Sequence, residues 1–150
     1  MFRGTYEHAI DAKGRTSFPS KFRELLAAEG TSKLVVTTGL DACLVAYPPR
    51  LFKEFEDKLE SLPQLDRAVR DMKRIWLGNA MDVDVDAVGR MLIPGFLREH
   101  AKLKRDAVWS GNGKNVELWD KSLFQAARLA ITDNEERREE IAQRLAELGL

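Results

Sequence analysis

The chain has 150 residues, and its 24 lysine and arginine side chains balance 24 aspartate and glutamate side chains, so the formal net charge is zero. This balance excludes a protein that is basic throughout, as many duplex-binding domains are, but it leaves room for a local basic surface. The longest uncharged stretch, residues 42–49, is far shorter than the about 20 residues needed to span a bilayer. Because Cys43 is the single cysteine and no amino-terminal apolar run is present, we expect a cytoplasmic protein without disulfides.

An internal repeat organises the chain. Residues 11–19 (DAKGRTSFP) and residues 86–94 (DAVGRMLIP) share Asp, Ala, Gly, Arg and Pro at an offset of 75. Residues 23–24 also match residues 98–99 at this offset, and further matches follow at an offset of 72. A half of this size is too small to build a good core alone. We therefore expect two homologous halves that pair around one core.

Each half is predicted to begin with a strand and a tight turn. Residues 5–10 and 81–85 alternate in polarity, as strands with one buried face do. The D-x-x-G-R segment that follows is typical of a hairpin turn, in which glycine adopts positive φ and aspartate accepts hydrogen bonds from the turn amides. We assign a loop-shaping role to four residues: Asp11, Gly14, Asp86 and Gly89.

A short returning strand, a helix and two further strands complete each half. Pro19 and Pro94 suit the first turn of a helix, where a missing N–H group costs little. Alternating apolar residues then predict four strands, over residues 34–38, 44–47, 108–110 and 116–119. The last two are joined by a glycine-rich turn, which favours a hairpin.

Between and after the repeats the apolar periodicity is helical. Two amphipathic helices are predicted within residues 51–77, on either side of Pro63, and a third within residues 133–148. The helices at 51–77 and the three tryptophans offer apolar surface for the core or for oligomerisation. The expected division is a first repeat, a connecting helical segment, a second repeat and a C-terminal helical tail, at residues 5–50, 51–77, 78–124 and 125–150.

The two repeats differ in local charge. Residues 1–23 hold five basic and two acidic side chains, a net charge of +3, whereas residues 81–90 hold one basic and three acidic side chains, a net charge of −2. The first repeat is therefore the better candidate for a nucleic-acid-binding face.

An arginine at the tip of a hairpin can bond both acceptors of a guanine edge or a phosphate. The alternative is an Asp–Arg ion pair that only stiffens the turn. We expect this alternative to be stronger for Asp86 with Arg90, because the second turn carries Val88 where the first carries Lys13. The residues assigned to DNA contact are Arg3, Lys13, Arg15 and Arg90.

The sequence holds no recognisable catalytic or metal-binding motif. It has two histidines, one cysteine and neither H-E-x-x-H nor C-x-x-C, and it lacks the G-x-S-x-G, Walker and dinucleotide-binding patterns. The alternating aspartates at 82, 84 and 86 are more typical of a solvated strand face than of a calcium loop. We expect no enzymatic activity, no cofactor, no metal and no small-molecule substrate.

Four segments resemble one protein family. The opening MFRGTYEHAIDAKGR, the second DAVGR block, the WLGNA segment before it and the ELW after the last turn are similar to the MraZ family of bacterial transcription factors, over residues 1 to about 131. The chain departs from that family at Thr38, where members often carry a basic residue, and at Lys102, where they often carry glycine.

This resemblance implies an α+β, mainly β fold. It implies a double-split β-barrel of swapped-hairpin type, formed by two tandem SpoVT/AbrB-like repeats with connecting and C-terminal α-helices. It also implies ring-shaped homo-oligomers that bind short tandem repeats upstream of the division and cell-wall gene cluster.

Two hypotheses about function follow. The first is a nucleoid-associated regulator that binds double-stranded DNA sequence-specifically, in which several identical protomers contact repeated DNA boxes. The alternative is a ring-forming assembly module that regulates a protein partner without contacting DNA, with the hairpin loops as clamps between subunits.

Overall fold

The computed structural model describes residues 1–150 and divides them into two compact units, Met1–Asp120 and Lys121–Leu150. The first unit contains, in chain order, β1 (Thr5–Ala9), β2 (Arg15–Ser17), α1 (Ser20–Ala28), β3 (Lys33–Thr38), β4 (Leu44–Tyr47), α2 (Pro49–Glu60), α3 (Arg67–Met72), the π-helical segment η1 (Lys73–Leu77), β5 (Met81–Asp84), β6 (Arg90–Leu92), α4 (Gly95–His100), β7 (Asp106–Asn112) and β8 (Asn115–Asp120). The second unit contains α5 (Lys121–Thr132) and α6 (Glu135–Glu147). None of these helices has the length and apolar character required to span a membrane.

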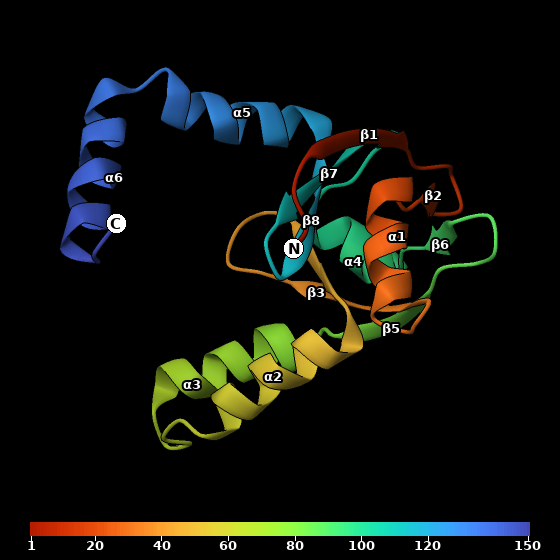
Figure 1. The fold of residues 1–150 in the computed structure, drawn as a ribbon, viewed down its shortest axis with the longest axis horizontal. Coiled ribbons are helices and arrows are strands. Elements are labelled where there is room, and N and C mark those ends of the chain that lie inside the picture. Colours follow the sequence, from red (N-terminus) through yellow and green to blue (C-terminus); the bar gives the residue numbers. More distant parts are fainter. The chain divides into compact units, whose positions relative to one another are not determined.

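The two halves exchange strands in an antiparallel arrangement (Figure 1). The main sheet has the order β1-β7-β8-β4-β3-β5, and a separate small sheet pairs β2 with β6. Strand β1 of the first half pairs with β7 of the second, and β5 of the second half pairs with β3 of the first. The prediction that the halves pair around one core is therefore confirmed.

The α+β class is confirmed, but the expectation of a mainly β chain is wrong, because more residues lie in helices than in strands. The connecting and C-terminal segments account for this difference, since both are helical throughout most of their length. The main sheet ends at β1 on one side and β5 on the other, with no hydrogen-bonded ladder between them. The strand pairings thus give two antiparallel sheets and do not show a closed barrel.

The core is formed by apolar side chains from both halves. Phe22 of α1 packs its ring against Phe2, Tyr6 and Phe18 at centroid distances of 5.4, 5.2 and 5.8 Å. The fully buried Trp109 of β7 donates a hydrogen bond from Nε1 to the Ser17 carbonyl at 3.1 Å. Because Trp109 belongs to the second half and Ser17 to the first, this contact fastens the two halves together.

The second unit consists of two helices, of which the sequence pattern predicted one. The expected helix at 133–148 corresponds to α6, where the Asn134 side chain caps the N-terminus by accepting a hydrogen bond from the Arg137 amide at 3.0 Å. Helix α5 begins at Lys121, within the segment assigned to the second repeat, and the periodicity did not single it out. Neither helix contains a buried residue.

The C-terminus of α4 carries local strain that its counterpart in the first half avoids. Lys102, with φ of 53°, is the one non-glycine residue with positive φ. Its amide donates to the Glu99 carbonyl and the Leu103 amide to the Arg98 carbonyl, at 3.1 and 2.9 Å, the pattern in which glycine is preferred. At the equivalent end of α1, Gly30 has φ of 79°.

We predict that Lys102→Gly raises the free energy of unfolding by about 1 kcal/mol, because glycine adopts this conformation without the steric cost of a Cβ atom. Urea unfolding of the full chain measures the change. The reverse exchange in the first half, Gly30→Lys, serves as the matched control and should lower the free energy of unfolding by a similar amount. A lower stability for Lys102→Gly would contradict this explanation.

Candidate nucleic-acid interface

The first hairpin loop is organised by the Asp11 carboxylate. Oδ1 accepts hydrogen bonds from the Lys13 and Arg15 amides, both at 2.9 Å, and Oδ2 accepts one from Arg15 Nε at 2.7 Å. The hydrogen bond from the Arg15 backbone, followed by that from its side chain, holds the pKa of Asp11 below its ordinary value. The two terminal amino groups of Arg15 form no hydrogen bond within the chain and lie on an exposed residue. The loop therefore presents a positioned guanidinium edge to solvent.

The second loop has the same aspartate-to-amide hydrogen bonds as the first, but its arginine side chain does not bond to the aspartate. Asp86 Oδ1 accepts hydrogen bonds from the Val88 and Arg90 amides at 3.0 and 2.9 Å, and these bonds, the one from Arg90 first, lower the pKa of Asp86. The side chain of Arg90 forms no ion pair with Asp86. The expectation that the Asp–Arg ion pair would be stronger in this turn is wrong, because the turn amides alone hold Asp86.

Each loop is packed against an arginine of the other repeat. Both turn glycines have positive φ, 88° for Gly14 and 86° for Gly89. A Cβ atom added at Gly14 would lie 2.5 Å from Arg98 Nε, and one added at Gly89 would lie 2.3 Å from Arg23 Nη1. Arg23 and Arg98 occupy equivalent positions in the repeat, and sequence reasoning gave them no role. Their recurrence at the offset of 75 indicates that the two arginines are equivalent, but it does not indicate the contact with the other repeat.

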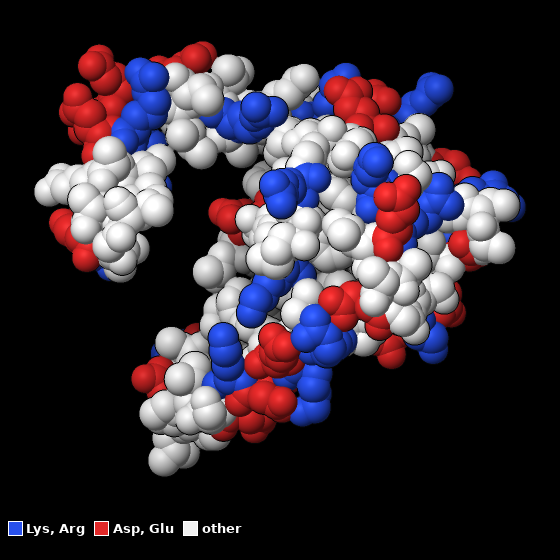
Figure 2. All heavy atoms as spheres, viewed as in Figure 1, with Lys and Arg blue, Asp and Glu red and all other residues white.

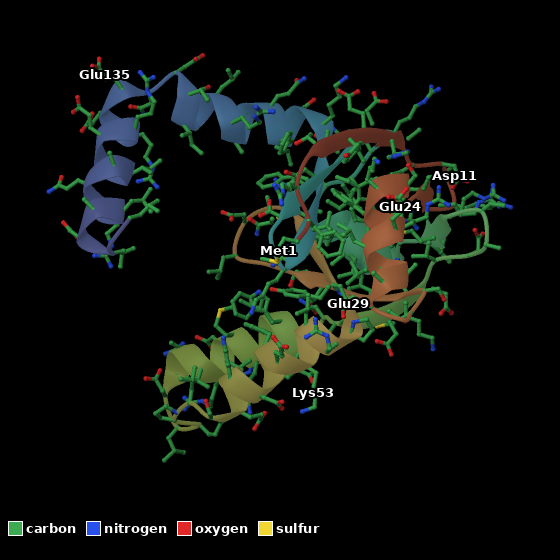
Figure 3. The ribbon with its side chains drawn as sticks, in the orientation of Figure 1. Met1, Asp11, Glu24, Glu29, Lys53 and Glu135 are labelled. Atoms are coloured by element: carbon green, nitrogen blue, oxygen red, sulfur yellow. The ribbon has the colours of Figure 1, made fainter.

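The small sheet brings the two loops to the same end of the fold, where Figure 3 labels Asp11. Arg15 lies opposite Leu92 and Arg90 opposite Ser17 in the register of β2 with β6. Lys13 and Arg15 therefore share one surface region with Arg90. Arg3 does not belong to this region, because it precedes β1 and its backbone lies against Gly111 near the β7–β8 turn.

Two basic residues that sequence reasoning missed flank the first loop. Lys104 and Arg105 are exposed and line a shallow cleft together with Asp11 and Arg98. The Ile10 amide donates a hydrogen bond to the Arg105 carbonyl at 2.7 Å, which fixes this segment beside the loop. The sequence feature that indicates these two basic residues is the KLKR run at 102–105, because the equivalent segment of the first repeat is GTSK at 30–33.

The surroundings of the two loops differ in charge. Figure 2 shows basic and acidic atoms close together at the right of the view, where the loops lie. The first loop has Lys13, Arg15, Lys104 and Arg105 near two acidic residues, Asp11 and the exposed Asp106. The second loop follows β5, which carries exposed Asp82 and Asp84 ahead of Asp86. We name the region formed by Lys13, Arg15, Lys104 and Arg105 the first-loop basic patch.

The remaining titratable residues form no comparable group. His8 on β1 is half-buried, and its burial followed by the charge of Arg23 lowers its pKa. The structure contains no group of three or more histidine, cysteine, aspartate or glutamate side chains placed to hold a metal ion. The chemistry that the loops can perform is hydrogen bonding and charge pairing.

Comparison with known proteins gives consistent matches along the chain. The family described as "MraZ protein, putative antitoxin-like" matches twice, over residues 1–75 and 76–148. A protein of Acetivibrio thermocellus named transcriptional regulator MraZ is 43% identical over 150 residues, which cover 100% of both chains. Proteins of the same name from Thermoanaerobacter sp. (strain X514) and Legionella pneumophila (strain Corby) are 40% and 42% identical, over 100% and 85% of each chain.

Proposed function

The chain belongs to the MraZ family, and from this premise we propose that it is a transcriptional regulator that binds double-stranded DNA. Its targets are short tandem repeats upstream of the division and cell-wall gene cluster, and it acts in the cytoplasm at the nucleoid. The observation that carries the proposal is the first-loop basic patch, in which Asp11 holds Arg15 by its Nε atom and leaves the outer guanidinium edge exposed.

In this mechanism the first hairpin loop enters the major groove. Arg15 donates from its two terminal amino groups to the O6 and N7 atoms of a guanine, or to a phosphate. Lys13, Lys104 and Arg105 pair with neighbouring phosphates and thereby fix the orientation of the loop on the duplex. Because the Asp11 hydrogen bonds already hold the loop, little conformational entropy is lost when DNA binds.

Arg90 and Arg3 have secondary roles in this proposal. The Arg90 side chain has no ion-pair partner within the chain, but the aspartates of β5 and its turn reduce the local attraction for phosphate. Arg3 lies beyond the other end of β1, so it pairs with a phosphate of the same duplex further along the groove. We expect both residues to contribute less than Arg15.

Oligomerisation supplies the affinity that one loop cannot. One small patch per protomer makes few contacts, and several linked copies on repeated boxes gain affinity through effective concentration. An apolar groove between α2, α3 and η1 is suited to the contact between protomers of a ring. Its lining is apolar apart from Lys58 and Ser61 and consists of Phe55, Leu59, Leu62, Ala68, Val69, Met72 and Trp76.

A salt titration tests the proposal against the alternative of an assembly module that does not contact DNA. We expect the affinity of the full chain for the DNA upstream of its own gene to fall steeply and linearly on a log–log plot as salt rises. Sedimentation velocity on the same samples reports the assembly state. Assembly without any salt-dependent DNA binding would support the alternative and contradict the proposal.

The two basic residues that the structure adds give a separate prediction. We expect the double variant Lys104→Ala and Arg105→Ala to weaken DNA binding uniformly across sequences and to lower the salt slope by about two per contacting protomer. The matched control is Lys53→Ala with Arg74→Ala, which removes two cations from α2 and η1. An equal loss in both double variants would show that net charge, rather than this patch, governs the affinity.

A further inference from the structure

A third hollow in the first unit, besides the cleft at the first loop and the apolar groove, has a partly polar lining. It is a cleft of about 200 Å³ between α2, η1 and the strands β3, β4 and β8. Aromatic rings form one wall, with Phe55 centred 4.6 Å from Trp76 in an edge-to-face contact and 6.2 Å from Tyr47 in a stacked one. The volume is below the roughly 300–1,000 Å³ of drug-sized ligand pockets, so it accommodates a single head group.

The charged residues that line the cleft are both acidic. Asp41, in the loop after β3, and Glu117, on β8, lie on its lining, and no lysine, arginine or histidine does. Glu117 is held in place, because its Oε2 accepts a hydrogen bond from the indole Nε1 of Trp119 at 2.7 Å. The cleft therefore combines a fixed carboxylate with π-systems and has no internal counter-ion.

Cys43 lies beside the same two carboxylates. Its buried thiol lies on the lining, and its pKa is raised to about 12, first by burial and then by the charges of Glu117 and Asp41. Burial disfavours a charge of either sign, whereas the two carboxylates disfavour an anion and attract a cation.

From this lining we propose that the cleft binds the head group of an organic cation, a guanidinium or primary ammonium group, stacked on Trp76 and paired with Glu117. A planar guanidinium fits both features, since it stacks on aromatic faces and donates in parallel to a carboxylate. The same chemistry is available from a free amine metabolite or from an arginine or lysine side chain of a second copy of the chain.

Trp76 fluorescence provides the test, with butylguanidinium as the probe and its neutral isostere butylurea as the control ligand. We expect butylguanidinium to change the emission saturably and to bind the full chain at least about tenfold more tightly than butylurea. In Trp76→Phe the probe loses the indole on which it stacks, so we expect clearly weaker binding, followed through the remaining emission of Trp119, whose indole donates to Glu117. Equal responses to the charged and neutral probes would overturn the proposal.

Variants of the carboxylates sharpen this test. Glu117→Gln keeps an oxygen for the Trp119 indole and should weaken butylguanidinium binding by about tenfold. Glu24→Gln, on the exposed face of α1 (labelled in Figure 3), removes a carboxylate outside the cleft and should leave binding unchanged. If Glu117→Gln fails to fold, Glu117→Asp replaces it, because the shorter side chain withdraws the carboxylate from the cation and should likewise weaken binding. Unchanged binding in the folded cleft variant would overturn the proposal.

Sedimentation velocity with and without butylguanidinium separates the two sources of the cation. Binding that leaves the sedimentation coefficient unchanged supports a free amine as the occupant. Binding that lowers the sedimentation coefficient supports a basic side chain of a second copy, which the probe displaces from the cleft.

Discussion

Arg15→Ala is expected to lower the affinity for the upstream repeats by about 10- to 100-fold for each loop that contacts DNA, which corresponds to about 1–3 kcal/mol. The outer edge of the guanidinium has no partner inside the chain, so its removal eliminates the contact that we assign to base recognition. Fluorescence anisotropy with a labelled duplex measures this change at a fixed salt concentration.

Arg90→Ala is the matched control for this substitution. It removes the equivalent arginine from a loop with the same backbone hydrogen bonds, and we expect a clearly smaller loss of affinity. The Asp11–Arg15 ion pair is exposed on both sides, so Arg15→Ala should leave the free energy of unfolding nearly unchanged. Equal losses of affinity for Arg15→Ala and Arg90→Ala would contradict the assignment of DNA contact to the first loop.

Gly14→Ala is expected to reduce the free energy of unfolding by about 3 kcal/mol, the largest stability effect that the loops predict. Two causes combine. The residue has φ of 88°, and an added Cβ atom would lie 2.5 Å from Arg98 Nε and 2.9 Å from the backbone oxygen of Ile93. The Arg98 side chain can move, but the Ile93 carbonyl cannot, because it belongs to the backbone and the Ile93 amide donates a hydrogen bond to the Gly14 carbonyl at 2.9 Å.

Gly30→Ala separates these two causes. Gly30 also has positive φ, 79°, but no atom would lie within 4 Å of its added Cβ. We expect Gly30→Ala to cost about 1 kcal/mol in urea unfolding, so the difference between the two variants reports the close approach of Arg98 and Ile93. A Gly14→Ala variant as stable as Gly30→Ala would show that the loop relaxes without strain.

Local features of the fold could be predicted from sequence because they depend on neighbouring residues. The D-x-x-G-R turns follow from the side-chain and φ preferences of aspartate and glycine, and Pro19 and Pro94 immediately precede α1 and α4. The repeat itself predicted that the halves are equivalent. The alternation of Tyr6, His8 and Ile10 likewise matches the partly buried face of β1 and its continuation.

Features that depend on tertiary contacts could not be predicted in this way. The packing of Arg98 against Gly14 joins residues of different repeats, and no spacing rule connects them. Lys104 and Arg105 become part of the first-loop basic patch only because β1 pairs with β7 and carries Ile10 to the Arg105 carbonyl. The ion pair between Asp11 and Arg15, with none between Asp86 and Arg90, depends on side-chain rotamers that the turn sequence does not specify.

The most direct test of the central claim is the affinity of the full chain for the DNA upstream of its own gene, with the tandem repeats either intact or shuffled at constant composition. At physiological salt we predict binding to the intact fragment that is at least about a hundredfold tighter than binding to the shuffled fragment, because each repeat presents its bases to one loop. Equal affinity for both fragments would contradict the claim that this chain recognises repeated DNA sequences.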